Sequence, residues 1–561
     1  MRIVLLALDG EPERAASSLR AQHPRAEIKI LTRDAVSRGN VFARLRALRA
    51  HAPDLFAVST ERLIWQQGQN ALLLFGALAG ARRVTLLDRE GASRAEHSLG
   101  VLSRAPFRLT REAWASAVSG WRARRELARL ERAVAGGAFA AQVDKTKDKH
   151  ADGARAKDER AESARGSSGA TRITYLRATP AAGTQAGGAT SHINGFIGGA
   201  LELGARVRVI SNDPIAGLDE SRVELKVIDP QPFGLTRPLF DLRNALLFTE
   251  RACREIERDP PDFIYQRYSR FNWAGVEASL RTGKPLFLEY NGSEVWMGRH
   301  WDRAGLFSLL ERAERLNLAA AARVFVVADV ERRNLERAGV PADKIVVNPN
   351  GVDVRRFRPG VGGSEARARL GVGEDETLVG FVGTFGPWHG ATVLAQAFNL
   401  IPREAGVRLL LVGTGSLRER VEEILRGGGA LGRVHFAGAV AHAEVPALLD
   451  ACDVLASPHV PPEDGSEFFG SPTKLFEYMA TSKGIVASRV GQIAEVLTDE
   501  ETALLVEPGD ARALADAVLR LSRSRGLRER LGAAAREVCV RRHTWARNAG
   551  RVLDAYRALG E

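Results

Sequence analysis

The sequence predicts an α/β protein in which a small α/β domain and a flexible linker precede two facing, doubly wound domains. Three observations predict this fold class. Short apolar runs typical of strands alternate with amphipathic helical segments along most of the 561 residues. Glycine-rich turns follow several of these strands, as in doubly wound sheets. A densely charged stretch without large apolar side chains separates the first group of strands from the rest.

Length and composition limit the possible classes of protein. A chain of 561 residues can form three or four domains, each with its own core. The formal net charge of +12 indicates acidic partners such as phosphates, anionic lipids or nucleic acid, although a genome biased to Arg would give the same sign. Cys253, Cys452 and Cys539 are far apart and form no CxxC motif, so we expect buried thiols in a reducing compartment.

No targeting or membrane-spanning segment is predicted. The first residues, MRIVLLALDG, contain one basic residue and a short apolar run, which predicts a first strand and not a signal peptide. The longest apolar stretch, Ala71–Ala81, is too short to cross a bilayer. We therefore expect a cytoplasmic protein, soluble or peripheral on the inner face of the membrane.

Residues 1–140 are predicted to form an accessory α/β domain with a basic helix. Its expected strands are Ile3–Leu8, Glu27–Thr32, Asp54–Ser59 and Arg83–Asp88. The domain has no GxGxxG turn, which favours a docking role over a second active site. From Thr110 the pattern becomes helical and basic, with Trp114 and Trp121 at its start. A membrane-surface helix and a docking helix both combine these residue types, and we favour the docking helix.

Residues 141–171 are predicted to be a disordered linker. They carry dense mixed charge and almost no large apolar side chain, so they cannot bury enough surface to become ordered. The main domain boundary is expected within this stretch.

Residues 172–345 are predicted to form the first doubly wound domain. A strand, a loop with Gly187-Gly188, a helix and a second strand open it, and small residues let the backbone approach a ligand closely. His192 lies early in that helix and needs no function as a polar helix residue. Asn291 follows the strand PLFLEY at its carboxyl end, where an α/β sheet faces its ligand crevice.

Residues 346–540 are predicted to form the second doubly wound domain, followed by a C-terminal helix at 541–561. A strand leads to a loop through Gly383-Thr384 and a helix that begins near Trp388-His389-Gly390. Further strands are expected within Val407–Ser416, Arg433–Val440, Asp453–His459, Gly484–Val490 and Thr502–Pro508. Together the two domains predict a cleft between two sheets.

The stretch Gly465–Ala480, GSEFFGSPTKLFEYMA, organises the second domain. It leads from a strand through a turn into a helix whose Leu475, Phe476 and Met479 can face the core. A helix start offers unpaired N–H groups and a positive dipole end, which suits phosphate. Lys474 adds a cation and Glu477 a carboxylate that could bridge two sugar hydroxyls. Alternatively, both are ordinary solvent-facing helix charges.

Several motifs recur in the order found in a known family. They are the Gly187-Gly188 opening, NPNGVD (Asn348–Asp353), VGTFGPWHG (Val382–Gly390), LLLVGTG (Leu409–Gly415), FFGSPTKLFEYMA (Phe468–Ala480) and TALLVEPGD (Thr502–Asp510). Taken together, this part of the chain resembles the retaining, nucleotide-sugar-dependent glycosyltransferases of family 4. These have two facing Rossmann-like domains, the GT-B arrangement. The likeness runs from Ile173 to the C-terminus and leaves residues 1–140 outside it.

The resemblance implies roles for individual residues. Glu477 would hold the ribose hydroxyls, Lys474 and His389 would face the diphosphate, and Asn291 occupies the place of the family's frequent histidine. The residues implied to bind the donor are Gly187, Gly188, Gly383, Thr384, Ser471, Thr473, Leu475 and Glu467. Residues 172–345 would form the acceptor side and residues 346–540 the nucleotide-sugar side.

The chain also departs from the family pattern. Many members carry a Glu-x7-Glu pair whose first Glu contacts the donor sugar. The corresponding position here holds Phe469, so Glu467 in the same loop is the alternative for this contact. The common Arg and Lys near the diphosphate correspond roughly to Thr384 and His389, and Lys474 would supply the positive charge.

The leading hypothesis is a hexosyltransferase that moves a sugar from a UDP- or GDP-sugar to a glycan or lipid-linked acceptor with retention of configuration. Cell-envelope polysaccharide synthesis beside an anionic membrane surface would fit. No convincing Asp-x-Asp is present, so neither a cofactor nor a catalytic metal is expected. A sugar-nucleotide epimerase of the same fold and a degenerate scaffold protein are the alternatives. A nucleic-acid partner is not expected, because the charge has no aromatic-interleaved motif.

Overall fold

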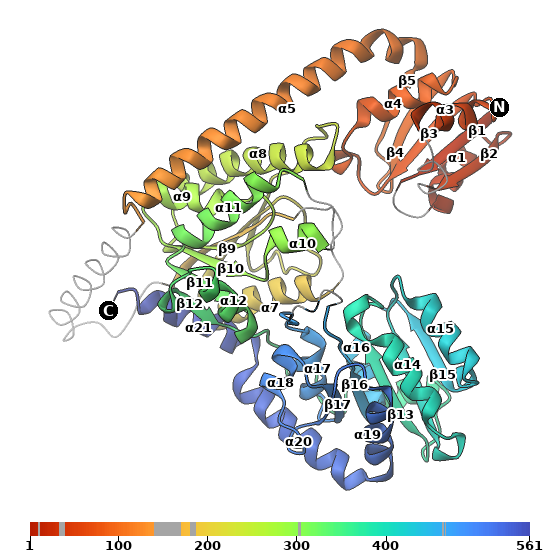
Figure 1. The fold of residues 1–561 in the computed structure, drawn as a ribbon, viewed down its shortest axis with the longest axis vertical. Coiled ribbons are helices and arrows are strands. Elements are labelled where there is room, and N and C mark those ends of the chain that lie inside the picture. Colours follow the sequence, from red (N-terminus) through yellow and green to blue (C-terminus); the bar gives the residue numbers. More distant parts are fainter. Residues whose placement is uncertain are drawn as a thin grey trace.

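The computed structural model describes residues 1–8, 12–32, 40–139, 170–179, 187–300, 305–462, 465 and 467–560. Within these ranges the strands form three sheets, which lie in three bodies along the chain (Figure 1). This arrangement confirms the predicted fold class. The linker predicted at 141–171 falls almost entirely outside the described residues.

The first body contains a sheet with the strand order β2-β1-β3-β4-β5. Its strands are β1 (Arg2–Ala7), β2 (Glu27–Thr32), β3 (Leu55–Thr60), β4 (Arg83–Asp88) and β5 (Ser93–His97). Its helices are α1 (Pro12–Gln22), α3 (Val41–Arg49) and α4 (Gln69–Leu78). Strand β5 pairs antiparallel with β4 and was not predicted, because its sequence SRAEH lacks the apolar pattern of a buried strand.

The helix α5 (Ser98–Ala135) connects the first body to the second (Figure 1). It begins well before the predicted Thr110, and Pro106, which usually marks a helix boundary, lies inside it. Its first half packs on α4. Its second half packs on the second body, where Ala123, Leu127 and Leu130 are fully buried. The inner face of α5 therefore connects the first two bodies.

The second body is the N-terminal lobe, a parallel sheet with the order β12-β11-β10-β9-β6-β7-β8. Its strands are β6 (Arg172–Arg177), β7 (Arg206–Ser211), β8 (Glu224–Val227), β9 (Phe263–Arg267), β10 (Leu286–Tyr290), β11 (Arg323–Val326) and β12 (Ile345–Val347). Its helices are α7 (Gly188–Glu202), α8 (Arg237–Arg258), α9 (Ala274–Thr282), α10 (Glu294–His300), α11 (Phe307–Ala320) and α12 (Asp329–Arg337).

The third body is the C-terminal lobe, a parallel sheet with the order β15-β14-β13-β16-β17-β18. Its strands are β13 (Thr377–Val382), β14 (Val407–Val412), β15 (Val434–Gly438), β16 (Val454–Ser457), β17 (Gly484–Ser488) and β18 (Leu504–Val506). Its helices are α13 (Gly363–Arg369), α14 (Ala391–Leu400), α15 (Arg418–Gly427), α16 (Val445–Ala451), α17 (Thr473–Ala480), α18 (Gly491–Val496), α19 (Ala511–Arg523) and α20 (Arg525–Arg542).

The last helix, α21 (Trp545–Arg557), returns to the N-terminal lobe and packs along α7 (Figure 1). Glycines make this approach possible: a Cβ on Gly195 would lie 2.1 Å from the Trp545 ring, and one on Gly199 would lie 2.3 Å from the Trp545 carbonyl oxygen. Val552 and Leu553 join the core beneath α7. The helix was predicted, but its attachment to the other lobe was not.

Candidate active site

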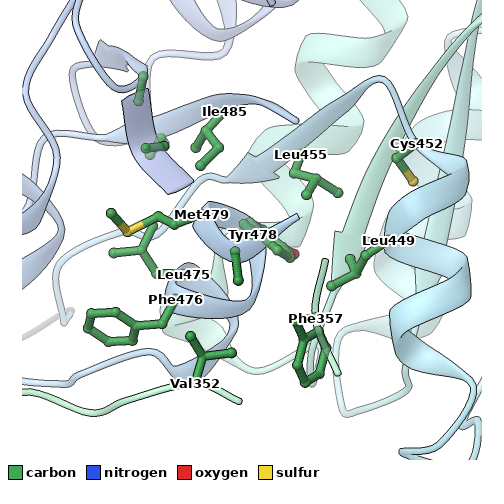
Figure 2. Close-up of a cluster of buried hydrophobic side chains, with 14 of the residues drawn as sticks. Val352, Phe357, Leu449, Cys452, Leu455, Leu475, Phe476, Tyr478, Met479 and Ile485 are labelled. Atoms are coloured by element: carbon green, nitrogen blue, oxygen red, sulfur yellow. The ribbon is translucent and has the colours of Figure 1, made fainter. Parts of the chain in front are cut away.

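The start of α17 is held in place by the core of the C-terminal lobe. Leu475, Phe476 and Met479 are fully buried and point into one apolar cluster (Figure 2). The hydroxyl oxygen of Tyr478 accepts a hydrogen bond of 2.8 Å from the backbone N–H of Val382, at the end of β13. The helix start is therefore fixed against the carboxyl end of the neighbouring strand, where parallel sheets bind ligands.

Lys474, in the first turn of α17, is a buried cation without a polar partner among the described residues. Its side chain is 7% exposed, and its Nζ forms no hydrogen bond to any residue that the structure describes. The Nζ lies 4.4 Å from the ring centroid of Phe381, a cation–π contact. Burial lowers the pKa of Lys474 to about 7, although the nearby carboxylate of Glu477 favours the charged form. An anion bound here would satisfy this ammonium group.

The loop after β13 lies directly beside Lys474. Gly383 adopts φ +152°, and a Cβ on it would lie 2.7 Å from the Nζ of Lys474. In the same loop, Thr384 Oγ1 and His389 Nδ1 are 2.8 Å apart. Burial, and then the charge of Lys474, lowers the pKa of His389 to about 3, so this imidazole is neutral at physiological pH. The loop therefore offers neutral hydrogen-bonding groups next to one cation.

His459, which follows β16, lies close to the same loop. Its ring centroid is 5.5 Å from that of His389, and its Nδ1 is 3.0 Å from Ser457 Oγ. Its Nε2 is buried and forms no hydrogen bond within the described part of the chain. Burial holds the pKa of His459 well below its usual range, and the charge of Lys474 acts in the same direction. His459 is thus a second buried polar group here without a partner on this nitrogen.

The start of α7 faces the start of α17 across the two lobes. Gly187 has φ +129°, and a Cβ on Gly188 would lie 3.3 Å from Thr473 Oγ1. Nearby, the carbonyl oxygen of Ser471 accepts a hydrogen bond of 2.8 Å from the side-chain amide of Asn350, in the segment that follows β12. The N-terminal ends of α7 and α17, each the positive end of its helix dipole, therefore lie close together.

The facing wall of the N-terminal lobe is built around the buried carboxylate of Glu289, on β10. Its Oε2 accepts a hydrogen bond of 2.9 Å from the hydroxyl of Tyr175, and its Oε1 accepts one of 2.7 Å from the amide of Asn291. His192 Nε2 lies 3.2 Å from Oε1, and Arg267 forms an ion pair with the same oxygen. Burial opposes ionisation of Glu289, but His192 and Arg267 outweigh it and hold its pKa well below the usual range.

Glu477 lies one turn along α17 from Lys474. Its side chain is largely buried, and its Oε1 is 3.6 Å from Nε2 of His442, in the segment after β15. This carboxylate has no arginine partner among the described residues, so its oxygens can accept hydrogen bonds from a ligand. A pair of hydroxyl groups on adjacent carbons matches the two carboxylate oxygens.

The structure thus brings most of the predicted site residues together where the two lobes meet. Two predicted donor residues differ. The backbone N–H of Leu475 already donates to the carbonyl oxygen of Pro472 at 2.9 Å, and its side chain is in the core, so Leu475 offers a ligand no free group. Glu467 has a side chain 61% exposed and forms an ion pair of 3.1 Å with Arg333 at the rim.

Four polar residues of this region were not predicted as part of the site: His192, Glu289, Asn350 and His459. His192 was interpreted as an ordinary helix residue, yet its Nδ1 lies 2.5 Å from Asn350 Oδ1, and the side chain is buried. A signal existed for Glu289, because it is a charged residue inside the apolar run PLFLEY. A charged residue in a buried strand requires a partner, although the strand does not identify that partner.

No group of three or more His, Cys, Asp or Glu side chains in the described part of the chain is arranged to hold a metal ion. No described helix is both long enough and apolar enough to cross a membrane.

Two family profiles match the chain. "Glycosyl transferase 4-like domain" matches residues 187–351, and "Glycosyl transferases group 1" matches residues 376–524. The two matches cover the N-terminal and the C-terminal lobe and leave the first body outside. They correspond to the two lobes that form the cleft.

Two proteins with similar sequences are also named as glycosyltransferases. A D-inositol 3-phosphate glycosyltransferase of Nocardioides sp. is 33% identical over 386 residues, which are 64% of this chain and 81% of that protein. The phosphatidyl-myo-inositol mannosyltransferase of Mycobacterium leprae is 35% identical over 238 residues, or 42% of this chain. The match spans 58% of the mycobacterial protein's length.

Among solved structures, HepE of Anabaena, determined in complex with UDP, superimposes with a TM-score of 0.55 at 20% identity. The superposition covers 69% of this chain and all of HepE. At this identity the likeness concerns the fold, which is that of a two-lobed GT-B glycosyltransferase. The family profiles, the Nocardioides relative and this fold together show that the chain belongs to the group 1 (GT4-type) glycosyltransferases, with an additional α/β domain at its N-terminal end.

Proposed function

We propose that this glycosyltransferase moves a hexose from a UDP- or GDP-sugar to a glycan or lipid-linked acceptor, with retention of configuration, at an anionic membrane surface. The observation that supports the donor site best is Lys474 in the first turn of α17, which is buried and forms no hydrogen bond to any described residue. The names of the relatives favour an inositol-containing acceptor, either a phosphate or a phospholipid. Synthesis of a cell-envelope glycan is the process that fits such an acceptor.

In this proposal the diphosphate of the donor lies between the starts of α7 and α17. Lys474 and the N–H groups near Gly188 and Thr473 stabilise the negative charge that develops on the departing nucleoside diphosphate. The Gly383-Thr384 loop and His389 lie against the phosphates from the side of the C-terminal lobe. Because these dipoles and this cation are already fixed, little reorganisation is needed during the reaction.

The remaining residues would orient the sugar and the ribose. Glu477 accepts hydrogen bonds from the two ribose hydroxyls, and Asn291, held by Glu289, faces the sugar from the N-terminal lobe. The bond between the anomeric carbon and the diphosphate oxygen breaks as the acceptor oxygen forms its bond on the same face. The acceptor proton passes to the departing diphosphate. This front-face route needs no protein nucleophile.

No divalent cation is required in this scheme, since Lys474 and the helix starts supply the positive charge. Transfer activity should therefore survive treatment with a chelator. Loss of activity in the chelator, restored by Mg²⁺ or Mn²⁺, would contradict this part of the proposal.

A screen of nucleotide sugars for protection against thermal unfolding tests the donor site, because a bound ligand raises the apparent stability. We expect one UDP- or GDP-sugar to protect the native chain, and Glu477→Ala to lose that protection while its own unfolding temperature stays close to that of the native chain. The anomeric configuration of the product tests retention. Donor breakdown without an acceptor would favour the epimerase alternative, and no binding of any nucleotide would favour the scaffold alternative.

A further inference from the structure

The outward face of α5 carries a stripe of large apolar side chains that pack against no other described element. Phe107 and Trp114 are each 71% exposed, Trp121 is 57% exposed and Val118 is 36% exposed. Their spacing of seven, four and three residues places them on one line along the helix. Burying such side chains is favourable, so a continuous exposed line of them indicates a contact surface.

This stripe lies opposite the face by which α5 docks on its own molecule. The docked face contains Ala105, Glu112, Ala123, Leu127 and Leu130, all of them buried. At 100° per residue, these positions lie on the other side of the helix from Trp114. In Figure 1, α5 runs along the outer edge of the molecule, with α8, α9 and α11 all on its inner side. A flat surface can therefore reach the stripe.

The acidic and basic side chains of α5 are also divided between these two faces. Its carboxylates turn toward the protein: Glu112 Oε1 accepts a hydrogen bond of 2.9 Å from Asn70, and Glu131 pairs with Arg312 at 2.7 Å. Glu126 Oε2 lies 3.4 Å from the indole nitrogen of Trp273. The outer face is left with cations and apolar groups.

Arginines surround the stripe. Arg104, Arg111 and Arg125 are exposed and form no ion pair with any residue in the described ranges, and Arg125 lies 5.3 Å from the Trp121 ring. The crowding of like charge extends to α8: burial lowers the pKa of Arg243, and the charges of Arg111 and Arg122 lower it further. This surface therefore complements an extended layer of negative charge.

Other segments of the chain and a second copy fit the surface poorly. Residues 140–169 hold Val143 as their one large apolar residue, so they lack the side chains needed to cover an apolar stripe. A second copy would place its own arginines against these arginines, a like-charge contact that costs several kcal/mol. A bilayer interface accepts both kinds of group, since Trp and Phe sit at headgroup depth while Arg contacts lipid phosphates.

We propose that the outward face of α5 binds the surface of an anionic lipid bilayer, with Phe107, Trp114, Val118 and Trp121 inserted at headgroup depth and Arg104, Arg111 and Arg125 on lipid phosphates. The line from Phe107 to Trp121 is roughly 20 Å long, enough for a helix lying in the interface. The inference deepens the proposed function, because it assigns membrane contact to a helix outside the two transferase lobes.

Flotation of the full chain with vesicles tests this surface. Vesicles of phosphatidylcholine with 30% phosphatidylglycerol should bind the chain, and vesicles of phosphatidylcholine alone should bind it much more weakly. The variant Phe107→Ser/Trp114→Ser/Trp121→Ser should lower the partition coefficient at least about 10-fold. Neutralising Arg104, Arg111 and Arg125 to Gln should lower it about fivefold per arginine, with a smaller effect at high salt.

Matched controls use exposed residues elsewhere. Leu400→Ser/Val540→Ser removes exposed apolar side chains from other helices, and Arg369→Gln/Arg523→Gln removes two arginines from the C-terminal lobe. Both should partition as the native chain does. Circular dichroism and thermal unfolding establish that each variant is folded.

Three outcomes would overturn the inference: equal partition of the triple Ser variant and the native chain, equal binding to neutral and anionic vesicles, or preferential binding of nucleic acid. Protection by the nucleotide sugar should be the same in the triple Ser variant and the native chain. Failure of this membrane surface is therefore distinguishable from failure of the proposed transferase site.

Discussion

The two lobes differ in whether the buried charged group on the side facing the other lobe has polar partners within the protein. In the N-terminal lobe, the carboxylate of Glu289 is surrounded by Tyr175, His192, Arg267 and Asn291, so its charge and its lone pairs are satisfied within the protein. In the C-terminal lobe, the ammonium group of Lys474 is equally buried and bonds no polar group among the described residues.

This difference distinguishes a buried charge that stabilises the fold from a buried charge that is available to bind a ligand. A satisfied buried network stabilises one conformation and has little left to offer a ligand. A buried cation without a partner costs stability and gains most when an anion arrives. We therefore propose that the donor diphosphate binds beside Lys474 and that Glu289 positions the residues around it.

The sharpest test of this comparison is Lys474→Met, which should weaken UDP or GDP binding about 100-fold, because it removes a charge-assisted contact in a dry site. The same substitution should raise the free energy of unfolding by about 1–3 kcal/mol, because a buried charge that no described residue hydrogen-bonds is replaced by an apolar side chain of similar length. Isothermal titration calorimetry and denaturant unfolding measure the two effects.

Lys483→Met is the matched control for Lys474→Met. Lys483 is in the same lobe, but its Nζ lies 3.3 Å from Asp450 Oδ1. Its loss should lower stability and leave nucleotide affinity unchanged. If Lys474→Met lowered stability without changing nucleotide affinity, Lys474 would stabilise the fold and would not bind the donor, which contradicts the proposed difference between the two lobes.

Glu289→Gln should show the reverse pattern. Removing the carboxylate leaves the partly buried Arg267 without its counter-charge, so the free energy of unfolding should fall by about 3 kcal/mol. Nucleotide affinity should stay within about threefold of the native value. Glu255→Gln, which breaks the pairs of Glu255 on α8 with Lys226 and Arg258, is the control and should cost less than about 1 kcal/mol. A large loss of nucleotide affinity in Glu289→Gln at unchanged stability would assign donor binding to both walls.

Nucleotide binding should depend on pH through the protonation of Lys474. In the free folded protein the pKa of Lys474 is about 7, against 10.5 in the unfolded chain. Between these values the unfolded chain holds the proton and the folded protein does not, so this residue makes stability rise with pH across the window. A bound diphosphate favours the charged form, so binding should take up a proton, and affinity should fall by up to about 10-fold per pH unit above pH 7.

Calorimetry at pH 8 in two buffers of different ionisation enthalpy measures this proton uptake. His389 and His459 face Lys474 but remain neutral in this range, because their pKa values lie far below it. Lys474→Met should abolish the proton uptake. An unchanged uptake in that variant would attribute the effect to another group.

The smallest effect is expected at the rim. Glu467→Ala removes an exposed ion pair with Arg333, so stability should change by less than about 1 kcal/mol and donor affinity by less than about threefold. A loss of affinity larger than about 10-fold would show that Glu467 turns inward to contact the donor sugar. Such a result would extend the donor site beyond the wall that contains Lys474.

The sequence alone predicted the fold class, and it predicted most residues of the candidate site. Strand and helix periodicity placed β6, α7, β10, β13 and α17, because the alternation of apolar and polar residues is a local signal. Glycine turns at the strand ends, at Gly187-Gly188 and Gly383, indicated the two sides of the candidate site. These features depend on residues that are close together in the chain, and the sequence shows such residues directly.

Pairings between distant segments were decided by the tertiary structure. His192 and Asn350, 158 positions apart, meet only because two lobes close on each other, and α21 crosses back to α7 because Gly195 and Gly199 leave room for Trp545. Whether a buried charge finds a partner depends on which side chains packing brings within about 4 Å of it. The sequence thus determined that a lysine stands at the start of α17, and the packing of the two lobes decided that it has no polar partner among the described residues while Glu289 has several.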